Sequence, residues 1–211
     1  MTTKLKLYNG ALRVLGETPL ASLEENRKPR RLLDAVWDDG AVRYCLEQGL
    51  WNFALRTSKF TYSSSVEPRF GHSRIFEKPD DWVRTVKLCH DEYMNSPIAD
   101  YRDEGAYWYA DQDDLYIQYV SDHAAYGGDL SLWPETFTNY VRHYLSHEIC
   151  RDLTQGETTL QKLQKETNRY LVDARSKDAM NQSAEFPPPG RWVRSRSNGK
   201  ARDRTGSQLI G

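Results

Sequence analysis

Apolar positions recur at helical spacing over the first fifty residues. Within residues 4–15 they return to one side of a helix, and Gly16 follows where such a helix would stop. A connector then leads to Pro29, a residue type favoured in the first turn of a helix. From there a second stripe continues to Gly49, made of Leu33, Val36, Trp37, Ala41, Tyr44, Cys45 and Gln48. We therefore expect a short helix and a long one, forming a helical part over residues 1–54.

The middle of the chain changes to the alternation that is typical of strands. Clusters of Pro, Gly and Asp separate five candidate strands, at residues 55–62, 73–77, 82–89, 105–110 and 114–120. In the last of these, Leu115, Ile117 and Tyr119 occupy alternate positions and would share one face. The pattern predicts a meander, one small antiparallel sheet inserted over residues 55–126.

The helical period returns after the Gly127-Gly128 pair. Pro134 marks the start of a helix whose apolar face comprises Phe137, Val141, Tyr144, Leu145, Glu148, Ile149 and Leu153. Gly156 separates it from a second long helix with a seam close to heptad spacing, made of Leu160, Leu163, Thr167, Tyr170, Leu171 and Ala174. Residues 127–182 thus read as a second helical hairpin. Because helices and strands are segregated, the fold class predicted is α+β, a helical bundle of two hairpins with an inserted sheet.

The pattern stops in the last thirty residues. The Pro187-Pro188-Pro189-Gly190 run excludes helix and central strand. Residues 190–211 hold six basic residues and one acidic residue, which leaves 23 basic and 29 acidic residues in the rest of the chain. We expect residues 183–211 to form an extended basic tail that becomes ordered on a partner.

Composition narrows the class of protein. Hydrophobic residues make up 38% of the chain, yet it has 13 Tyr and 6 Trp, residue types that either serve shared interfaces or fill a sheet. A net charge of -1 argues against nucleic-acid or membrane-surface binding by the chain as a whole. Neither a secretory leader nor an apolar run of the roughly 20 residues that a membrane span needs is evident. Three scattered cysteines favour a reducing compartment. We expect synthesis in a cytoplasm, without a cofactor and without membrane contact.

One cluster has the spacing of metal ligands. His143 and His147 stand four apart on a predicted helix, and Cys150 falls near them. The residue after His143 is Tyr144, however, where a zinc protease places its glutamate base. We favour a polar helix–helix or subunit contact over a metal site.

Catalytic patterns are weak elsewhere. The acid pairs are Asp38-Asp39, Asp80-Asp81 and Asp113-Asp114. Adjacent side chains point in different directions, so solvated turns and helix faces explain these pairs better than a general acid and base. The Gly127-Gly128 pair lacks the lysine and spacing of a phosphate loop. We predict that the chain is not an enzyme.

The tail carries the candidate binding residues Arg191, Trp192, Arg194 and Arg196. They could dock into an acidic groove of a protein partner, with the indole as a buried anchor. They could also bind nucleic acid by phosphate contacts and stacking, or the tail could only solubilise the chain. All three interpretations stay open, and the protein partner is preferred.

Several segments of the chain resemble one known family. They are Tyr8–Glu17, Leu20–Asn26, Gly49–Arg56, Phe76–Arg84, Tyr116–Ser121, Trp133–Phe137 and Tyr140–Leu153. In their order and spacing these segments resemble the tail tubular protein A family, the head-to-tail adaptors of short-tailed phages and their relatives. The basic tail after Pro189 departs from the family pattern.

The resemblance implies a virion protein of the tail or neck. Such a protein would form a twelve-subunit ring between the portal and the tail nozzle, extend the DNA channel and dock the next tail component. Its partners would be its own copies, the portal and the nozzle or next tail protein, while genomic DNA passes through without specific binding. We expect Arg191, Trp192, Arg194 and Arg196 to contact the portal.

Two other functions stay open. Some family members are proposed to degrade cell-wall or capsule glycans, which needs two carboxylates about 5 to 10 Å apart across a groove. The third possibility is a nucleic-acid-binding protein that works through the tail, with an affinity that falls steeply with salt.

Overall fold

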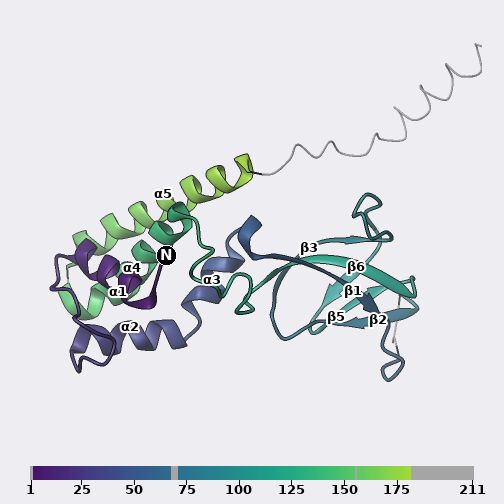
Figure 1. Cartoon of the computed structure of the whole chain (residues 1–211), viewed down its shortest axis with the longest axis horizontal. Coiled ribbons are helices and arrows are strands. Elements are labelled where there is room, and N and C mark those ends of the chain that lie inside the picture. The colour runs from purple at the N-terminus through teal and green to yellow at the C-terminus, as the bar shows by residue number, and fades with distance from the viewer. Residues whose placement is uncertain (1, 68–70, 155, 182–211) are drawn as a thin grey trace, which may run out of the picture. The chain divides into compact units, whose positions relative to one another are not determined.

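The computed structural model describes residues 2–67, 71–154 and 156–181. Within them the chain is mixed α+β, with five α-helices and two antiparallel three-stranded sheets (Figure 1). The helices are α1 (Lys4–Leu15), α2 (Lys28–Asp38), α3 (Ala41–Glu47), α4 (Glu135–Thr154) and α5 (Glu157–Met180). The strands are β1 (Leu55–Thr61), β2 (Arg74–Glu77), β3 (Trp82–Cys89), β4 (Arg102–Glu104), β5 (Tyr107–Ala110) and β6 (Asp114–Ser121).

The first helix matches its prediction. Thr3 caps α1 by accepting a hydrogen bond from the Lys6 N–H at 3.3 Å, and Gly16 ends the helix in the left-handed conformation, with φ of 76°. None of the described helices combines the length and the apolar character that a membrane crossing demands.

The second helix is broken, where one continuous helix was predicted. Gly40 takes a φ of 94° between α2 and α3, a backbone conformation that side chains disfavour. Its N–H donates to the carbonyl of Trp37, and its own carbonyl accepts from Tyr44, so one residue ends α2 and begins α3. The prediction was wrong because apolar residues continue at helical spacing on both sides of the turn.

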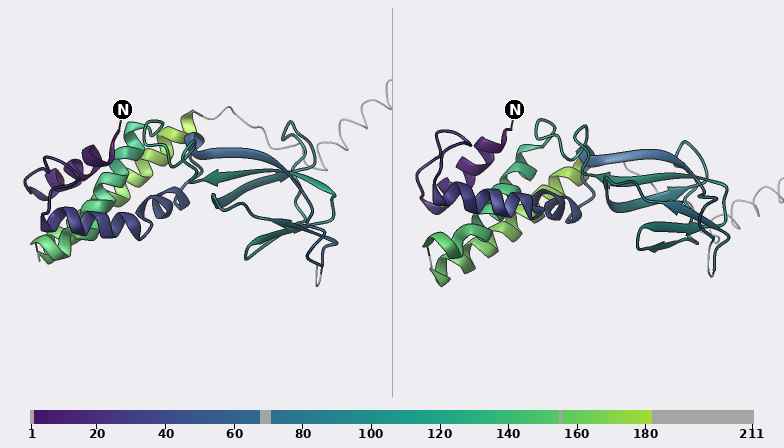
Figure 2. Two further views of the ribbon diagram at one scale, coloured as in Figure 1. Left: turned by 60° about the horizontal axis from the view of Figure 1, so that its bottom comes forward. Right: turned by 90° about the horizontal axis from the view of Figure 1, so that it is seen from below.

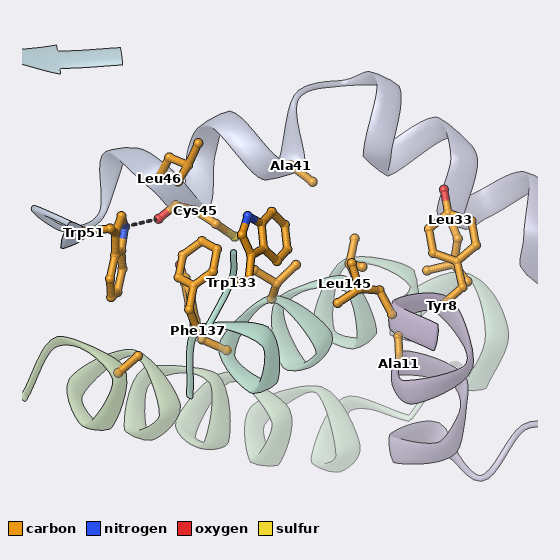
Figure 3. Close-up of a cluster of buried hydrophobic side chains, with 14 of the residues drawn as sticks. Tyr8, Ala11, Leu33, Ala41, Cys45, Leu46, Trp51, Trp133, Phe137 and Leu145 are labelled. Atoms are coloured by element: carbon orange, nitrogen blue, oxygen red, sulfur yellow. Dashed lines mark hydrogen bonds between the residues drawn. The ribbon is translucent and has the colours of Figure 1, made fainter. Parts of the chain in front are cut away.

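The helices lie together in both views of Figure 2 and share one apolar core, part of which is drawn in Figure 3. α4 contacts α1, α2 and α5, so its apolar residues are buried on several sides. Leu145 of α4 lies with Ala11 of α1 and Leu33 of α2, all of them fully buried. Burial of each of the two leucines contributes about 2 kcal/mol. These contacts explain why apolar residues at helical spacing continue over a longer stretch in α4 than in the other described helices.

The strands form two sheets, where one was predicted. The first sheet has the order β1-β6-β3 and the second the order β2-β5-β4, all antiparallel. β2 pairs only with β5, so the chain leaves the first sheet after β1 and returns to it at β3. β4 was missed because its three residues are charged and exposed and show no alternation. The strand predicted from residue 105 begins at Tyr107, because Gly105 turns with φ of 56°.

A polar cluster joins the two sheets. The Thr85 hydroxyl on β3 accepts hydrogen bonds from the indole N–H groups of Trp82 at 3.1 Å and Trp108 at 2.8 Å, and it donates to Asp103 at 2.6 Å. The Lys78 side chain is only 5% exposed, and its ammonium lies 3.8 Å from the Trp82 ring and 2.5 Å from Asp103. One hydroxyl thus satisfies the indole of fully buried Trp108 and that of half-buried Trp82, and a buried ammonium lies against the Trp82 ring.

Replacing Thr85 by Val keeps the shape of the side chain and removes these three hydrogen bonds. We expect the free energy of unfolding to fall by about 2 kcal/mol, because two indole N–H groups lose their acceptor. Urea unfolding followed by tryptophan fluorescence measures the loss. The same change at exposed Thr57 on β1 is the control and should stay within about 0.5 kcal/mol. If the Thr85 and Thr57 variants were equally stable, the hydrogen bonds of Thr85 would not stabilise the fold.

Candidate functional site

The predicted portal-binding residues Arg191, Trp192, Arg194 and Arg196 lie outside the described residues, as does the rest of the tail from Gln182.

The candidate metal ligands each have another contact. The His143 ring stacks on Tyr170 of α5 with 3.9 Å between ring centres, and its Nδ1 lies 2.8 Å from the Asn139 carbonyl. Nδ1 of His147 lies 3.1 Å from Glu148. Cys150 is buried, with its Sγ 3.2 Å from the Thr154 hydroxyl. His143 therefore makes the helix–helix contact that the sequence favoured. Residues 2–67, 71–154 and 156–181 contain no group of three metal-ligating side chains poised for an ion.

The acid pairs differ in their surroundings. Asp113 and Asp114 pair with Arg74 at 2.9 Å and Lys59 at 2.8 Å, as solvated turn residues do. Asp38 and Asp39 are exposed. Asp81 departs from the prediction of a solvated pair, because its side chain is only 13% exposed while its neighbour Asp80 is exposed.

The Asp81 carboxylate connects three segments of the first sheet. It accepts a hydrogen bond from Arg56 Nη1 of β1 at 2.8 Å, another from the Ser121 hydroxyl of β6, and a longer one from the Tyr119 hydroxyl at 3.4 Å. Burial alone would raise the pKa of this carboxyl, but the hydrogen bonds from Ser121 and Arg56 and the Arg56 charge lower it overall. Burial and the nearby carboxylate raise the pKa of Tyr119 to about 12. We call Arg56, Asp81 and Ser121 the Asp81 junction.

An aromatic cluster lies where α3 leads into β1 (Figure 3). Phe137 of α4 packs edge-on against Trp51 at 4.7 Å and Trp133 at 4.9 Å between ring centres. The Trp51 indole donates to the Cys45 carbonyl at 3.2 Å, and the Trp133 indole donates to the Gly127 carbonyl at 2.8 Å. A side chain at Gly127 would come within 2.3 Å of the Ser121 carbonyl, so only glycine fits beside the Asp81 junction. The cluster therefore requires close backbone packing as well as large rings.

Asp178 near the end of α5 was missed by the sequence interpretation. Its carboxylate accepts the Asn52 N–H at 3.1 Å, and the Asn52 side chain donates to the Asp178 carbonyl at 2.8 Å. Burial raises the pKa of this carboxyl, and the hydrogen bond from Asn52 lowers it less. The sequence did contain a sign of this burial. Asp178 lies four residues after Ala174, so it falls on the same face of α5 as the apolar seam.

A tyrosine-lined groove of about 180 Å³ lies between α3, α4 and α5. Tyr44 is 46% exposed and stacks on Tyr144 with 4.9 Å between ring centres. His147 and Glu148 also line the groove, so two residues of the suspected metal cluster border a surface depression. Exposed tyrosine rings suit protein contacts, because they provide large area at low entropic cost.

No protein-family model matches the chain, and no curated protein matches it.

Replacing Asp81 by Ala leaves the Arg56 guanidinium and the Ser121 hydroxyl without their shared acceptor. We expect a loss of about 2 to 3 kcal/mol in unfolding free energy at pH 7. Because the folded pKa of Asp81 is lowered, its contribution exists above the unfolded aspartate pKa and disappears as pH falls through the folded value. The difference between wild type and variant should therefore shrink in acid. Asp80→Ala is the matched control, expected within about 0.5 kcal/mol. An equal effect of both substitutions would contradict the junction's role.

Asp178→Asn should have the opposite pH dependence. The raised pKa means that ionisation of Asp178 is disfavoured in the folded state, so wild type loses stability as pH rises through the folded pKa. Asparagine keeps an acceptor for Asn52 without a buried charge, so the variant should gain up to about 1 kcal/mol over wild type at pH 7. The gain should vanish at pH values below the usual aspartate range. Thermal unfolding across pH measures both, and a variant less stable than wild type at pH 7 would refute the assignment.

Proposed function

We propose that this chain is a structural virion protein, a head-to-tail adaptor that forms a ring between the portal and the tail nozzle. In this proposal the helices form a bundle of two hairpins with the sheets inserted between them. Residues 183–211 extend from this body and dock on the portal. The ring lengthens the DNA channel and presents the surface on which the next tail component assembles.

The observation that carries the proposal is that the segments resembling the adaptor family contact one another in a series. In the N-terminal segments, the Asn9 amide accepts from the Leu20 N–H at 2.7 Å and donates to the Leu20 carbonyl at 3.0 Å. The Ser146 hydroxyl of α4 donates to the Ala11 carbonyl at 3.0 Å. The opening segments and the last helical segment are thus joined.

The remaining segments meet at the aromatic cluster and at the Asp81 junction. Trp51, from the segment around β1, packs on Phe137, and Trp133 closes the same cluster. Arg56, Asp81 and Ser121 come from three different matched segments. The resembling segments thus belong to one connected framework, as a shared adaptor fold would require.

Charge supports a channel subunit. Outside residues 190–211 the chain has an excess of six acidic residues. A body of like charge to DNA offers phosphates little attraction, as a channel needs if DNA is to pass without sticking. Ring subunits also need two different complementary faces, since a heterologous contact closes only by rotation.

The glycan hydrolase alternative receives less support. A shallow pocket lined by Glu77, Asp80 and Asp81 places carboxylates together. A general acid needs a raised pKa, whereas the pKa of Asp81 is lowered by the contacts of the junction. A raised pKa occurs at Asp178, which instead binds the Asn52 backbone.

Deleting residues 187–211 tests the portal contact. We expect the body to keep its circular dichroism spectrum and melting temperature, because the described core ends before this segment. Binding to immobilised portal should be lost. Deleting only residues 197–211 is the control, since it keeps Arg191, Trp192, Arg194 and Arg196 and should bind. Equal binding of full-length and 187–211-deleted chains would refute tail docking. Purified virions that lack this polypeptide would refute the adaptor role itself.

A further inference from the structure

A cationic pocket opens between α1 and α4. Its volume is about 470 Å³, and its lining residues are Lys6, Asn9, Gly10, Arg13, Val14, Asn139, Arg142 and His143. Three of these side chains carry a positive charge, and none is a carboxylate. Such a lining favours an anionic occupant.

Arg142 is held in the wall of this pocket. Its Nη1 donates to Glu135 at 2.8 Å and to Asn139 at 2.7 Å, both on α4. A side chain at Gly10 would lie 2.6 Å from Arg142 Cδ, so glycine at this position lets the arginine cross the surface of α1. The Nε of Arg142 is buried and has no hydrogen-bond partner among the described residues. Glu135 is 69% exposed, so water screens its neutralising effect on the pocket.

Arg13 supplies a further positive charge to the lining of the pocket. It is exposed in the last turn of α1 and forms no ion pair with a described residue. Among the described residues, the acids therefore do not fully match the cationic side of the pocket.

An acidic counterpart lies at the end of α2. Asp38 and Asp39 are exposed, and within residues 2–67, 71–154 and 156–181 neither forms an ion pair. The last turn of α2 contains no basic residue. Carboxylates are unfavourable beside the negative end of the helix dipole, so a cation supplied from outside would relieve this charge.

The pocket and the acidic end occupy different faces. Tyr8 of α1 points to α2, where its hydroxyl donates to Asp34 at 2.9 Å. Gly10 follows two residues later, about 200° around the helix at roughly 100° per residue. The pocket thus opens on the side of α1 away from α2. A chain with complementary charges on two different faces suits head-to-tail association of its copies.

We propose that Asp38 and Asp39 of one copy bind in the cationic pocket of the next copy. This contact rests on the proposed adaptor function and names the two faces that its ring would join. An acidic peptide segment fits the pocket better than a nucleic-acid backbone, because the body around it carries an excess of acidic residues that would repel an extended phosphate chain.

Charge exchange tests the contact with the full-length chain. Sedimentation velocity over a concentration series at low salt should show self-association of the wild type. Arg13→Glu, or Asp38→Lys with Asp39→Lys, should each weaken it by about tenfold or more. An equimolar mixture of the two variants should restore pairwise association, because the unchanged pocket of one variant then meets the unchanged acidic end of the other. Arg169→Glu on the exposed face of α5 is the matched control and should associate as wild type does.

The outcomes separate the two proposals. A wild-type chain that stays monomeric, or variants that associate normally, would overturn this contact and leave the adaptor role to the test on virions. Loss in the variants without recovery in the mixture would also overturn it. If Arg13→Glu abolished a mobility shift of duplex DNA but not self-association, phosphate would be the occupant and the proposal would fail. Absence of the chain from virions would remove the adaptor role without changing the measured association.

Discussion

The Asp81 carboxylate is the constraint on which the first sheet depends. Asp81 lies just before β3, and its carboxylate accepts hydrogen bonds from Arg56 on β1 and Ser121 on β6. One carboxylate therefore connects all three strands of the sheet. A carboxylate that is 13% exposed has lost most of its hydration, and only ionic and hydroxyl donors replace what water supplied. The strands must therefore keep the register that brings these donors together. In the observed register, Arg56 of β1 pairs with Tyr119 of β6, and Trp82 of β3 pairs with Ser121 of β6, as this requirement predicts.

Close packing around Gly127 and Trp51 connects the Asp81 junction to the helices. Gly127 follows β6 closely enough to exclude any side chain, and its carbonyl receives the Trp133 indole just before α4 begins. Phe137 then packs on Trp51, at the exit from α3. Asp178 binds Asn52 directly beside it, which brings the end of α5 to the same place. Rings provide most of the buried area, while the hydrogen bonds determine which way each ring faces.

This arrangement suits a protein whose role is to hold position in an assembly. The buried ionisable groups Asp81, Lys78 and Asp178 link elements of the fold, while Arg13, Asp38 and Asp39 lie exposed without an ion pair to a described residue. A rigid framework lets surface groups such as Arg13 and Asp39 keep fixed positions, which a ring contact would require. The adaptor proposal and the proposed head-to-tail contact both draw on this division between an internally satisfied framework and an exposed, complementary surface.

Local pattern was enough for the helices α1, α4 and α5. The apolar period and the glycine stop at Gly16 determined α1, and longer periods on both sides of Gly156 determined α4 and α5. These features depend on residues a few positions apart, which a sequence displays directly. Tertiary structure alone decided the strand β4 and the division into two sheets, since each depends on which distant segment supplies a hydrogen-bond partner. The break at Gly40 has local hydrogen bonds, to Trp37 and from Tyr44, but the apolar pattern that continues on both sides of it did not show the break. Tertiary structure also decided that Asp81 is buried while Asp80 is solvated. Burial is a property of the packed chain, because two adjacent and chemically identical side chains differ only in what long-range folding places around them.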